Sequence, residues 1–282
     1  MKLRYLTIVI SLFITISISA QENAPKSLLA SYSTPVKFSP APDLSPQEIE
    51  MKVNAINPYT LYRKGSVAEY AFEKDGKPAK FDDNPVFRGF GYSYIQQIVV
   101  DERVENGLLV AYIQQAFFNK KHQPSKELPK SIKSYYYPTE IDTAGVYHFT
   151  HDINRDYLPL RGRKGYAMVI PSNLKVGDIL QCNTIKDITI NGLGGNVNYT
   201  TTYSNFKVVA EERITTPAGT FDCLKLTGTA DEKKSGDYTY SCLYNWWIAR
   251  GIGIVRYEIY ENTNKGLKKP PFVIYLNKLD LK

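Results

Sequence analysis

Histidine and cysteine, the residues that most often carry acid–base and metal chemistry, number only three each among the 282 residues of this sequence. His148 and His151 stand three apart, a spacing that suggests a shared metal ion. In a strand, however, residues three apart point to opposite faces, so the two imidazoles could not meet at one ion without a bulge. We therefore predict neither a metal site nor a cofactor.

Nucleophilic catalysis has no recognisable motif either. No serine lies in a Gly-x-Ser-x-Gly elbow, and no cysteine shares a motif with a histidine. Adjacent carboxylates such as Asp82–Asp83 and Asp101–Glu102 could belong to a glycosidase pair, which spacing alone neither reveals nor excludes. The sequence therefore favours a non-enzymatic protein, with an unrecognised hydrolase as the remaining catalytic alternative.

The strongest functional patch is a lysine-rich loop at 119–134, followed at once by three tyrosines. Tyrosine rings can stack on sugars, and lysines can bind phosphate or carboxylate groups. The competing interpretation is a solvated loop that leads into a core strand. A tryptophan pair adds a second aromatic feature, because neighbours in a strand point to opposite faces and one of them could be an exposed platform. The candidate binding residues are Lys120, Lys121, Lys126, Lys130, Lys133, Tyr135, Tyr136, Tyr137 and Trp247.

Strands must position these side chains, because the hydrophobic pattern has a period of two from about residue 61 onward. Asn106-Gly107 is a strong hairpin signal between two such runs. About ten to twelve antiparallel strands predict an all-β fold, either a large curled sheet or a partly closed barrel. The predicted strands are 67–73, 92–104, 108–118, 145–150, 166–170, 179–190, 196–215, 220–228, 238–248, 253–260 and 272–281.

One short helix is predicted over Pro46–Ala55. Ser45 and Glu48 fit a capping box, and Pro46 suits the first helical position. We place this helix in a lead-in at 45–60, after a tether rich in proline and serine at 21–44 and before the β domain at 61–282.

The N-terminus predicts export. Lys2 and Arg4 precede a short apolar run that ends at Ala20, as in a signal peptide covering residues 1–20. Cleavage there would lower the formal net charge from +7 to +5, which is too mild to indicate nucleic-acid binding. We predict a periplasmic or secreted protein with no transmembrane segment after cleavage. In such a compartment Cys223 and Cys242, on successive strands, could form a disulfide, or they could be buried thiols.

Three motifs carry a family resemblance. They are PSNLKVGD at 171–178, TPAGTFDC at 216–223 and WWIARGIGIVR at 246–256. Together they resemble the TapB family, exported proteins of Gram-negative bacteria with an uncharacterised domain, from about Leu61 to the end of the chain. Trp247 stands where that family usually has Tyr or Phe. The resemblance implies a curled antiparallel sheet, a location in the cell envelope and a tetratricopeptide-repeat protein as a partner. It supplies no catalytic residues.

The motifs themselves indicate a structural role. Proline and glycine at 217–219 favour a turn, and the glycines at 251 and 253 allow a tight turn with close backbone approach. The residues assigned to this structural role are Pro217, Gly219, Phe221, Cys223, Trp246, Gly251 and Gly253.

The function that these observations favour is a binding or interaction module, with a lipid-like ligand held in the concave face of the sheet. The alternatives are a module that binds a glycan or a protein partner through the lysine loop and tyrosines, and the unrecognised hydrolase.

Overall fold

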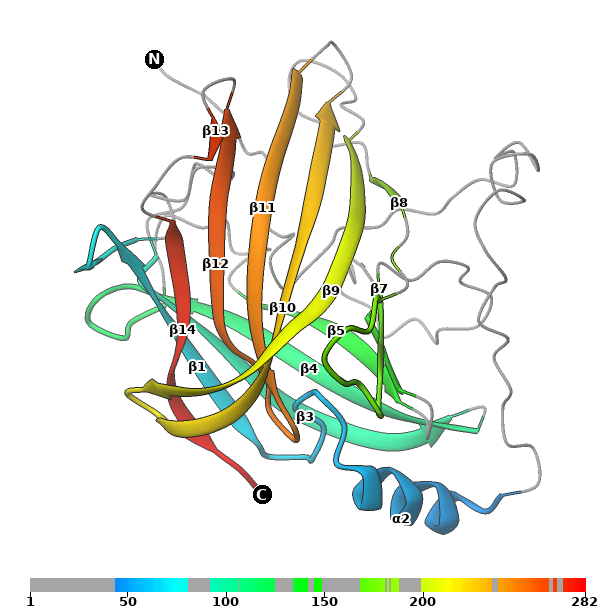
Figure 1. Cartoon of the computed structure of the whole chain (residues 1–282). Coiled ribbons are helices and arrows are strands. Elements are labelled where there is room, and N and C mark those ends of the chain that lie inside the picture. Colours follow the sequence, from blue (N-terminus) through cyan, green and yellow to red (C-terminus); the bar gives the residue numbers. More distant parts are fainter. Residues whose placement is uncertain are drawn as a thin grey trace.

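The computed structural model describes residues 44–80, 92–105, 107–124, 134–141, 145–148, 168–180, 182, 184–187, 199–234, 238–263, 266–267 and 271–282. Within these ranges the chain forms one curled antiparallel sheet and one short helix (Figure 1). The all-β fold class predicted from the sequence is confirmed. The predictions for residues 1–43 lie outside the described residues.

Helix α2 (Pro46–Ile56) begins at the predicted capping box. The hydroxyl of Ser45 accepts the N–H of Glu48 at 3.3 Å, and the Glu48 carboxylate accepts the N–H of Ser45 at 2.7 Å. The backbone hydrogen bond from Ser45 also holds the pKa of Glu48 below its usual value. Asn57 ends the helix in the left-handed conformation. The helix lies against β3 and β4 and buries Ile49 and Val53 in the common core.

The described strands form a 14-stranded sheet in which every pairing is antiparallel. The strands are β1 (Val67–Lys74), β2 (Lys77–Pro78), β3 (Tyr94–Glu105), β4 (Leu108–Phe118), β5 (Ser134–Ile141), β6 (Gly145–His148), β7 (Met168–Pro171), β8 (Thr184–Asp187), β9 (Tyr199–Thr216), β10 (Gly219–Lys234), β11 (Tyr238–Ala249), β12 (Gly253–Thr263), β13 (Gly266–Leu267) and β14 (Phe272–Asp280). Their order is β7-β6-β5-β4-β3-β1-β14-β12-β11-β10-β9-β8, with β2 beside β1 and β13 beside β12.

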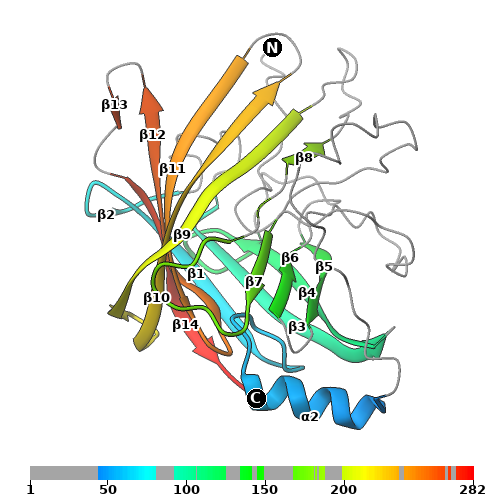
Figure 2. The same cartoon turned by 45° about the vertical axis from the view of Figure 1, so that its right-hand side comes forward.

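The two ends of the described chain meet in the middle of this sheet. β1 pairs with β14 from Val67 opposite Asp280 to Lys74 opposite Phe272. On one side of this pair lies an N-terminal arm of β3 to β7, and on the other a C-terminal arm of β12 to β8. The strands of the two arms run in clearly different directions, and α2 lies beyond the ends of β3 and β4 (Figures 1 and 2).

A connecting segment links the two outer ends of the sheet. After β7, the chain reaches β9 and pairs with it outside the named strands: Gly177 donates to the Val208 carbonyl at 2.8 Å, and Leu180 donates to the Phe206 carbonyl at 2.7 Å. The same stretch therefore follows the last strand of the N-terminal arm and hydrogen-bonds to the C-terminal arm. This connection keeps the sheet curled.

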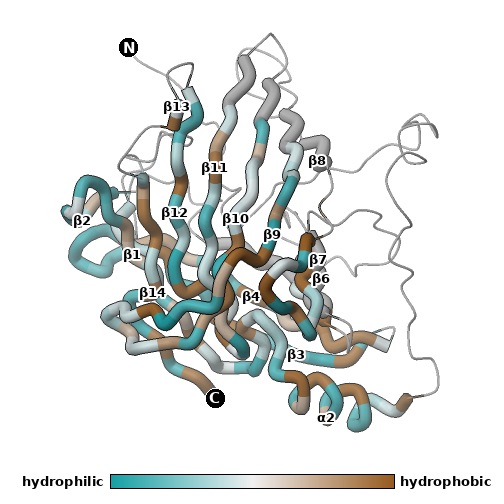
Figure 3. Tube along the Cα trace, viewed as in Figure 1, coloured by the Kyte–Doolittle hydropathy of each residue, from teal (hydrophilic) through white to brown (hydrophobic). Residues whose placement is uncertain are grey.

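Hydropathy varies along the strands (Figure 3), and because successive side chains of a strand point to opposite sides, the sheet has two distinct faces. We call the face that carries Tyr70, Ile113, Leu226 and Tyr257 the inner face, because these side chains belong to one buried cluster. The opposite face, on which Glu258 lies, is called the outer face. Charged residues that are buried on a sheet of this kind need partners, and those partners define the sites described below.

Two sequence-based predictions differ from the structure. The range 134–141 is absent from the predicted strands, because consecutive tyrosines and Pro138 hide the alternation. In the structure β5 pairs with β4 along its length, which agrees with the alternative of a loop that leads into a strand. In the predicted strand 179–190, the described residues contain β8 and bridge residues at Ile179 and Cys182 rather than one continuous strand. The long strand expected at 196–215 is confirmed as β9.

The cysteines are free thiols, so the disulfide alternative is not found. Cys242 lies opposite Ala230 on β10, seven residues beyond Cys223, which places the two thiols about 24 Å apart along the hairpin. Burial raises the pKa of Cys223 to about 12 and that of Cys182 to about 11. These thiols are therefore protonated at neutral pH and poorly reactive.

Candidate functional site

The turn between β11 and β12 contains both glycines of the third motif and packs on the end of α2. The N–H of Gly251 donates to the Pro58 carbonyl at 2.7 Å. Gly251 has φ +68°, and a Cβ atom there would lie 2.6 Å from Oδ1 of Asn57. At Gly253, with φ +90°, a Cβ would lie 3.4 Å from Cα of Thr60. Close approach and positive φ together explain why both positions are glycine.

Arg250 connects three segments at this turn. Its guanidinium donates to the carbonyls of Ile56 and Ser172, each at 2.8 Å, and lies over the ring of Tyr59 at 4.6 Å. It thus ties the end of α2 and the loop after β7 to the turn at the end of β11. Arg250 belongs to the third motif, but no local pattern predicts this role for it, because its partners are about 80 and 190 residues away.

The turn between β9 and β10 is formed as predicted. Thr216 pairs with Gly219, which leaves Pro217 and Ala218 as the two turn residues. The hydroxyl of Thr216 accepts the N–H of Ala218 at 3.2 Å, and Gly219 has φ +139°. The ring of Phe221 lies 3.4 Å from the position that a Cβ of Gly219 would take. These contacts agree with the structural role assigned to the second motif.

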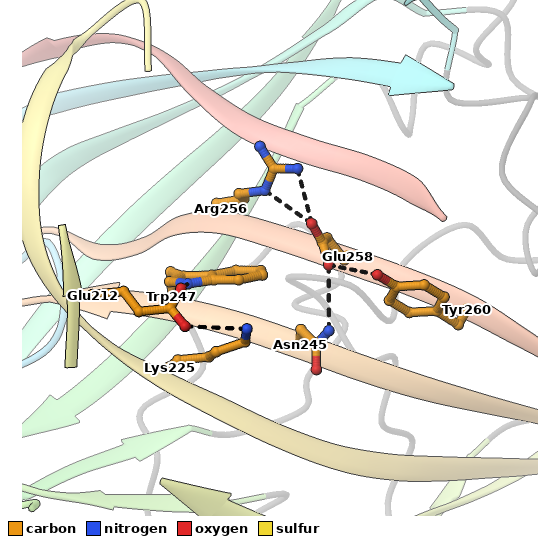
Figure 4. A network of polar contacts seen from close by, with 7 residues as sticks. All are labelled: Glu212, Lys225, Asn245, Trp247, Arg256, Glu258 and Tyr260. Atoms are coloured by element: carbon orange, nitrogen blue, oxygen red, sulfur yellow. Dashed lines mark hydrogen bonds and ion pairs between the residues drawn. The ribbon is translucent and has the colours of Figure 1, made fainter. Parts of the chain in front are cut away.

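Trp246 and Trp247 point to opposite faces, as their places in β11 require. Trp247 is only 4% exposed, and its indole N–H donates to Glu212 at 2.7 Å. The Lys225 ammonium and the Arg256 guanidinium lie over its ring, 4.8 and 5.6 Å from the ring centroid (Figure 4). The expectation of an exposed stacking platform at Trp247 is therefore corrected: cations cover the ring, and it is not open to a sugar.

Glu258 is the second acidic centre of this outer-face network. Its carboxylate accepts hydrogen bonds from Arg256 at 2.8 and 3.1 Å, from Asn245 at 3.3 Å and from Tyr260 at 2.9 Å (Figure 4). Burial, followed by the hydrogen bond to Glu258, raises the pKa of Tyr260 to about 12. Each lone pair that faces the protein is used, so the carboxylate is held rather than presented to a substrate.

Glu212 is also held as an anion. The hydrogen bond from Trp247 lowers the pKa of its carboxyl group, and Lys225 at 3.2 Å adds to this effect. A carboxyl group with a lowered pKa is a poor proton donor at neutral pH. The network contains two cations, Lys225 and Arg256, and two anions, Glu212 and Glu258, so its charges balance. This is the arrangement of a structural ionic cluster.

The inner face around Trp246 is different. The rings of Phe206 and Tyr257 lie 4.6 and 5.5 Å from Trp246, and Tyr203 and Tyr244 extend the cluster on either side. The indole N–H of Trp246 is buried and has no hydrogen-bond partner among the described residues. Phe206 lies so closely over the neighbouring β10 backbone that a Cβ at position 228 would come within 2.4 Å of its ring. Around Trp246 this face is apolar and aromatic, with an unused donor on the indole ring.

The lysine loop begins at a turn that is fixed to the outer face. The side-chain oxygen of Asn119 accepts the N–H groups of Lys121 and Gln123, and His122 stacks on Tyr94 at 4.1 Å. His122 Nε2 also lies 3.3 Å from Glu69, a carboxylate that is almost fully buried. Sequence reasoning missed this anchor, because Glu69 precedes His122 by 53 residues.

The predicted binding residues that the structure describes are divided between the two arms of the sheet. Lys120 and Lys121 are exposed after β4, in the N-terminal arm, whereas Trp247 lies in β11 of the other arm. The three tyrosines at 135–137 are part of β5. Lys126, Lys130 and Lys133 lie outside the described residues, as does His151 of the histidine pair. Binding by the lysines and tyrosines stays a prediction.

Within the described ranges, no helix is long and apolar enough to cross a bilayer. The same residues contain no group of three or more His, Cys, Asp or Glu side chains placed to hold a metal ion.

The comparisons with known proteins agree with this fold. A family model described as DUF3108-like matches residues 163–268, the part of the chain that contains all three motifs. The resemblance to the TapB family is not confirmed. No curated protein matches the chain.

Two solved structures share the fold. One is a candidate exported protein with a YmcC-like fold from Bacteroides fragilis, with a TM-score of 0.51 and 14% identity over 78% of this chain and 98% of the other. The second is a candidate lipoprotein from Parabacteroides distasonis, with a TM-score of 0.54 and 14% identity over 79% of this chain and 98% of the other.

Proposed function

We propose that this chain is a non-enzymatic, exported binding protein that holds a lipid-like ligand against the inner face of its curled sheet. The observation that carries the proposal is the aromatic cluster around Trp246, whose buried indole N–H has no partner among the described residues. Natural cores seldom leave a buried donor unused, because the lost hydrogen bonds to water are not replaced. A ligand with an acceptor atom would satisfy it.

The location supports the same proposal. The N-terminal sequence has the features of a signal peptide, and the two proteins of similar fold are named as exported and as a lipoprotein. Apolar molecules in the envelope need a protein surface that shields them from water, and a curled sheet with an aromatic inner face suits that task.

The polar network on the outer face argues against a catalytic role there. Both carboxylates bind cations and accept hydrogen bonds, and a lowered pKa keeps Glu212 ionised. A hydrolase of the two-carboxylate type needs one carboxyl group that keeps its proton. We therefore assign this network to stability and the inner face to binding.

Native mass spectrometry tests the proposal on the mature protein, purified from its own envelope without detergent. The expected result is a reproducible extra mass that organic solvent releases. The Ile179→Ser variant is a matched control for adsorption, since Ile179 is an exposed apolar residue at 71% and removing it should leave the extra mass in place. The bare polypeptide mass, together with no uptake of added lipid, would overturn the proposal.

The lysine loop and the tyrosines of β5 support a second candidate, a module that binds a glycan or a protein partner. The specific observation is the anchored turn, which presents Lys120 and Lys121 to solvent. Retention on an anionic polysaccharide that is lost on replacing both lysines by glutamine would favour this function. Under this second candidate function, the protein partner would be a tetratricopeptide-repeat protein.

A further inference from the structure

We infer that the inner face selects a ligand with an uncharged hydrogen-bonding group, such as an ester or an amide next to an acyl chain, and that Gln115 binds that group. The inference rests on the proposed function and names the ligand class for the same face. It is carried by the position of Gln115 and by the distribution of buried charge between the two faces.

Gln115 lies on the inner face of β4, between the core residues Ile113 and Phe117. Its side chain is 0% exposed, and neither the amide oxygen nor the amide nitrogen has a hydrogen-bond partner among the described residues. A buried primary amide offers two donors and an acceptor, so leaving all of them unused is costly. This is a second unused polar group on the face that carries Trp246.

The described polar side chains on this part of the inner face are neutral. Gln97 of β3 lies directly opposite Gln115 and is also buried, and Thr139 of β5 lies beside Ala111 on the same face. Ser93, just before β3, is buried as well, with a hydroxyl that has no partner among the described residues. Thr139 and Ser93 are each four positions from Gln115, in opposite directions along the strands, so the neutral polar side chains are spread over the inner face and Gln97 lies directly beside Gln115.

Buried charge, by contrast, lies on the outer face. Glu69 and Glu258 are the two charged side chains among the buried residues that the structure describes. Glu69 is next to the inner-face residue Tyr70, and Glu258 is next to the inner-face residue Tyr257, so both carboxylates point to the outer face. Both have basic partners on that face. A ligand carboxylate or phosphate placed beside Gln115 would therefore find no buried cation among the residues that the structure describes, whereas an ester or amide carbonyl needs only a donor.

The test compares two probes with one acyl chain, 1-monomyristoylglycerol and myristate, both below their critical micelle concentrations. Titration calorimetry at pH 8 measures binding to the whole mature protein, delipidated beforehand. We expect the neutral ester to bind at least about tenfold more tightly than the ionised acid, the ratio that one unsatisfied buried charge or hydrogen bond produces.

The decisive variant is Gln115→Leu, with Gln114→Leu as its matched control, because Gln114 is the next residue on β4 and points to the outer face. In Gln115→Leu we expect about tenfold weaker binding of the ester, unchanged binding of myristate and a raised Tm, since an unused buried amide is replaced by an apolar side chain. In Gln114→Leu we expect the preference for the ester to remain.

The outcomes separate this inference from the proposed function. If neither probe binds, the proposed function fails and the inference fails with it. If both probes bind equally, or if Gln115→Leu keeps the preference for the ester, the protein binds lipid but Gln115 does not select it. A lowered Tm in Gln115→Leu would mean that the amide already has a partner in the fold, and this also overturns the inference.

Discussion

Trp246 and Trp247 are the same residue type at consecutive positions of one strand, yet they have opposite surroundings. Trp247 lies among charges: its N–H binds Glu212, and Lys225 and Arg256 lie over its ring. Trp246 lies among aromatic rings, and its N–H is unused among the described residues. On the outer face the indole N–H of Trp247 has a hydrogen-bond partner, whereas on the inner face the indole N–H of Trp246 has none among the described residues. The comparison indicates where stability is built and where a ligand would act.

The largest expected effect is a loss of stability of the whole fold, which would disturb the surroundings of both tryptophans. Gly251→Val puts a β-branched side chain at φ +68° and 2.6 Å from Oδ1 of Asn57. We expect a loss of about 3 kcal/mol or more in the free energy of unfolding, since strain and the clash add. Thermal and urea unfolding measure it. Gly266→Ala is the control, because it has a positive φ with nothing within 4 Å, and about 1 kcal/mol is expected there. An unchanged melting curve for Gly251→Val would contradict the structural role of the motif.

The second prediction tests the two tryptophans directly. Trp247→Phe removes a hydrogen bond to a carboxylate and weakens two cation–π contacts, whereas Trp246→Phe removes an unused donor. Both substitutions remove a similar area of aromatic ring. The difference between their losses in the free energy of unfolding therefore reports the polar contacts. We expect Trp247→Phe to cost about 2 kcal/mol more than Trp246→Phe in urea unfolding of the ligand-free protein. Equal losses would mean that the two faces do not differ as described.

The third prediction concerns the inner face alone. Gly228→Ala forces the Phe206 ring away from β10, because the new Cβ would lie 2.4 Å from it. Phe206 is fully buried and contacts Trp246, so we expect a loss of about 1–3 kcal/mol and a shift in the emission of Trp246. Measuring emission in a Trp247→Phe background assigns the signal. A shift in the emission of Trp247 in the converse Trp246→Phe background would show that the change reaches the outer face.

The smallest effect is the pH dependence of the outer face. The pKa of Glu212 is lowered in the folded protein, chiefly by the hydrogen bond from Trp247. Its contribution to stability is therefore complete above the pKa of an unfolded glutamate, about 4.3, and is lost as the pH falls through the lower folded value. Wild type should be more stable than Glu212→Gln at pH 7, and the two should converge below pH ~4. A constant difference from pH 7 to pH 3 would contradict the assignment.

Much of the fold could be predicted from local patterns. The Ser45 and Glu48 capping box fixes the start of α2, because both partners lie within one turn of helix. The hairpin at Asn106-Gly107 joins β3 and β4 at the predicted residues. The range of β5 is absent from the predicted strands because three consecutive tyrosines and a proline carry no alternation.

The candidate sites were harder to predict. Four of the residues in the outer-face network, Glu212, Lys225, Arg256 and Glu258, come from three strands and have no common spacing in the sequence. Trp247 was chosen as an exposed platform, although its ring is covered. Gln115 is an ordinary residue in the sequence, and what distinguishes it is burial without a hydrogen-bond partner among the described residues.

By itself, the sequence determined the period-two strands, the capped helix, the turns at Pro217 and Gly251, and the fact that the two tryptophans point to opposite faces. Each of these depends on residues a few positions apart, so local sterics and hydrogen bonding decide it. Three outcomes depend on tertiary contacts: which tryptophan lies beside charges, which thiols are far apart, and which glutamine has no hydrogen-bond partner among the described residues. Those outcomes depend on the register of β9 to β12 and on the meeting of β1 with β14, contacts between residues far apart in the chain.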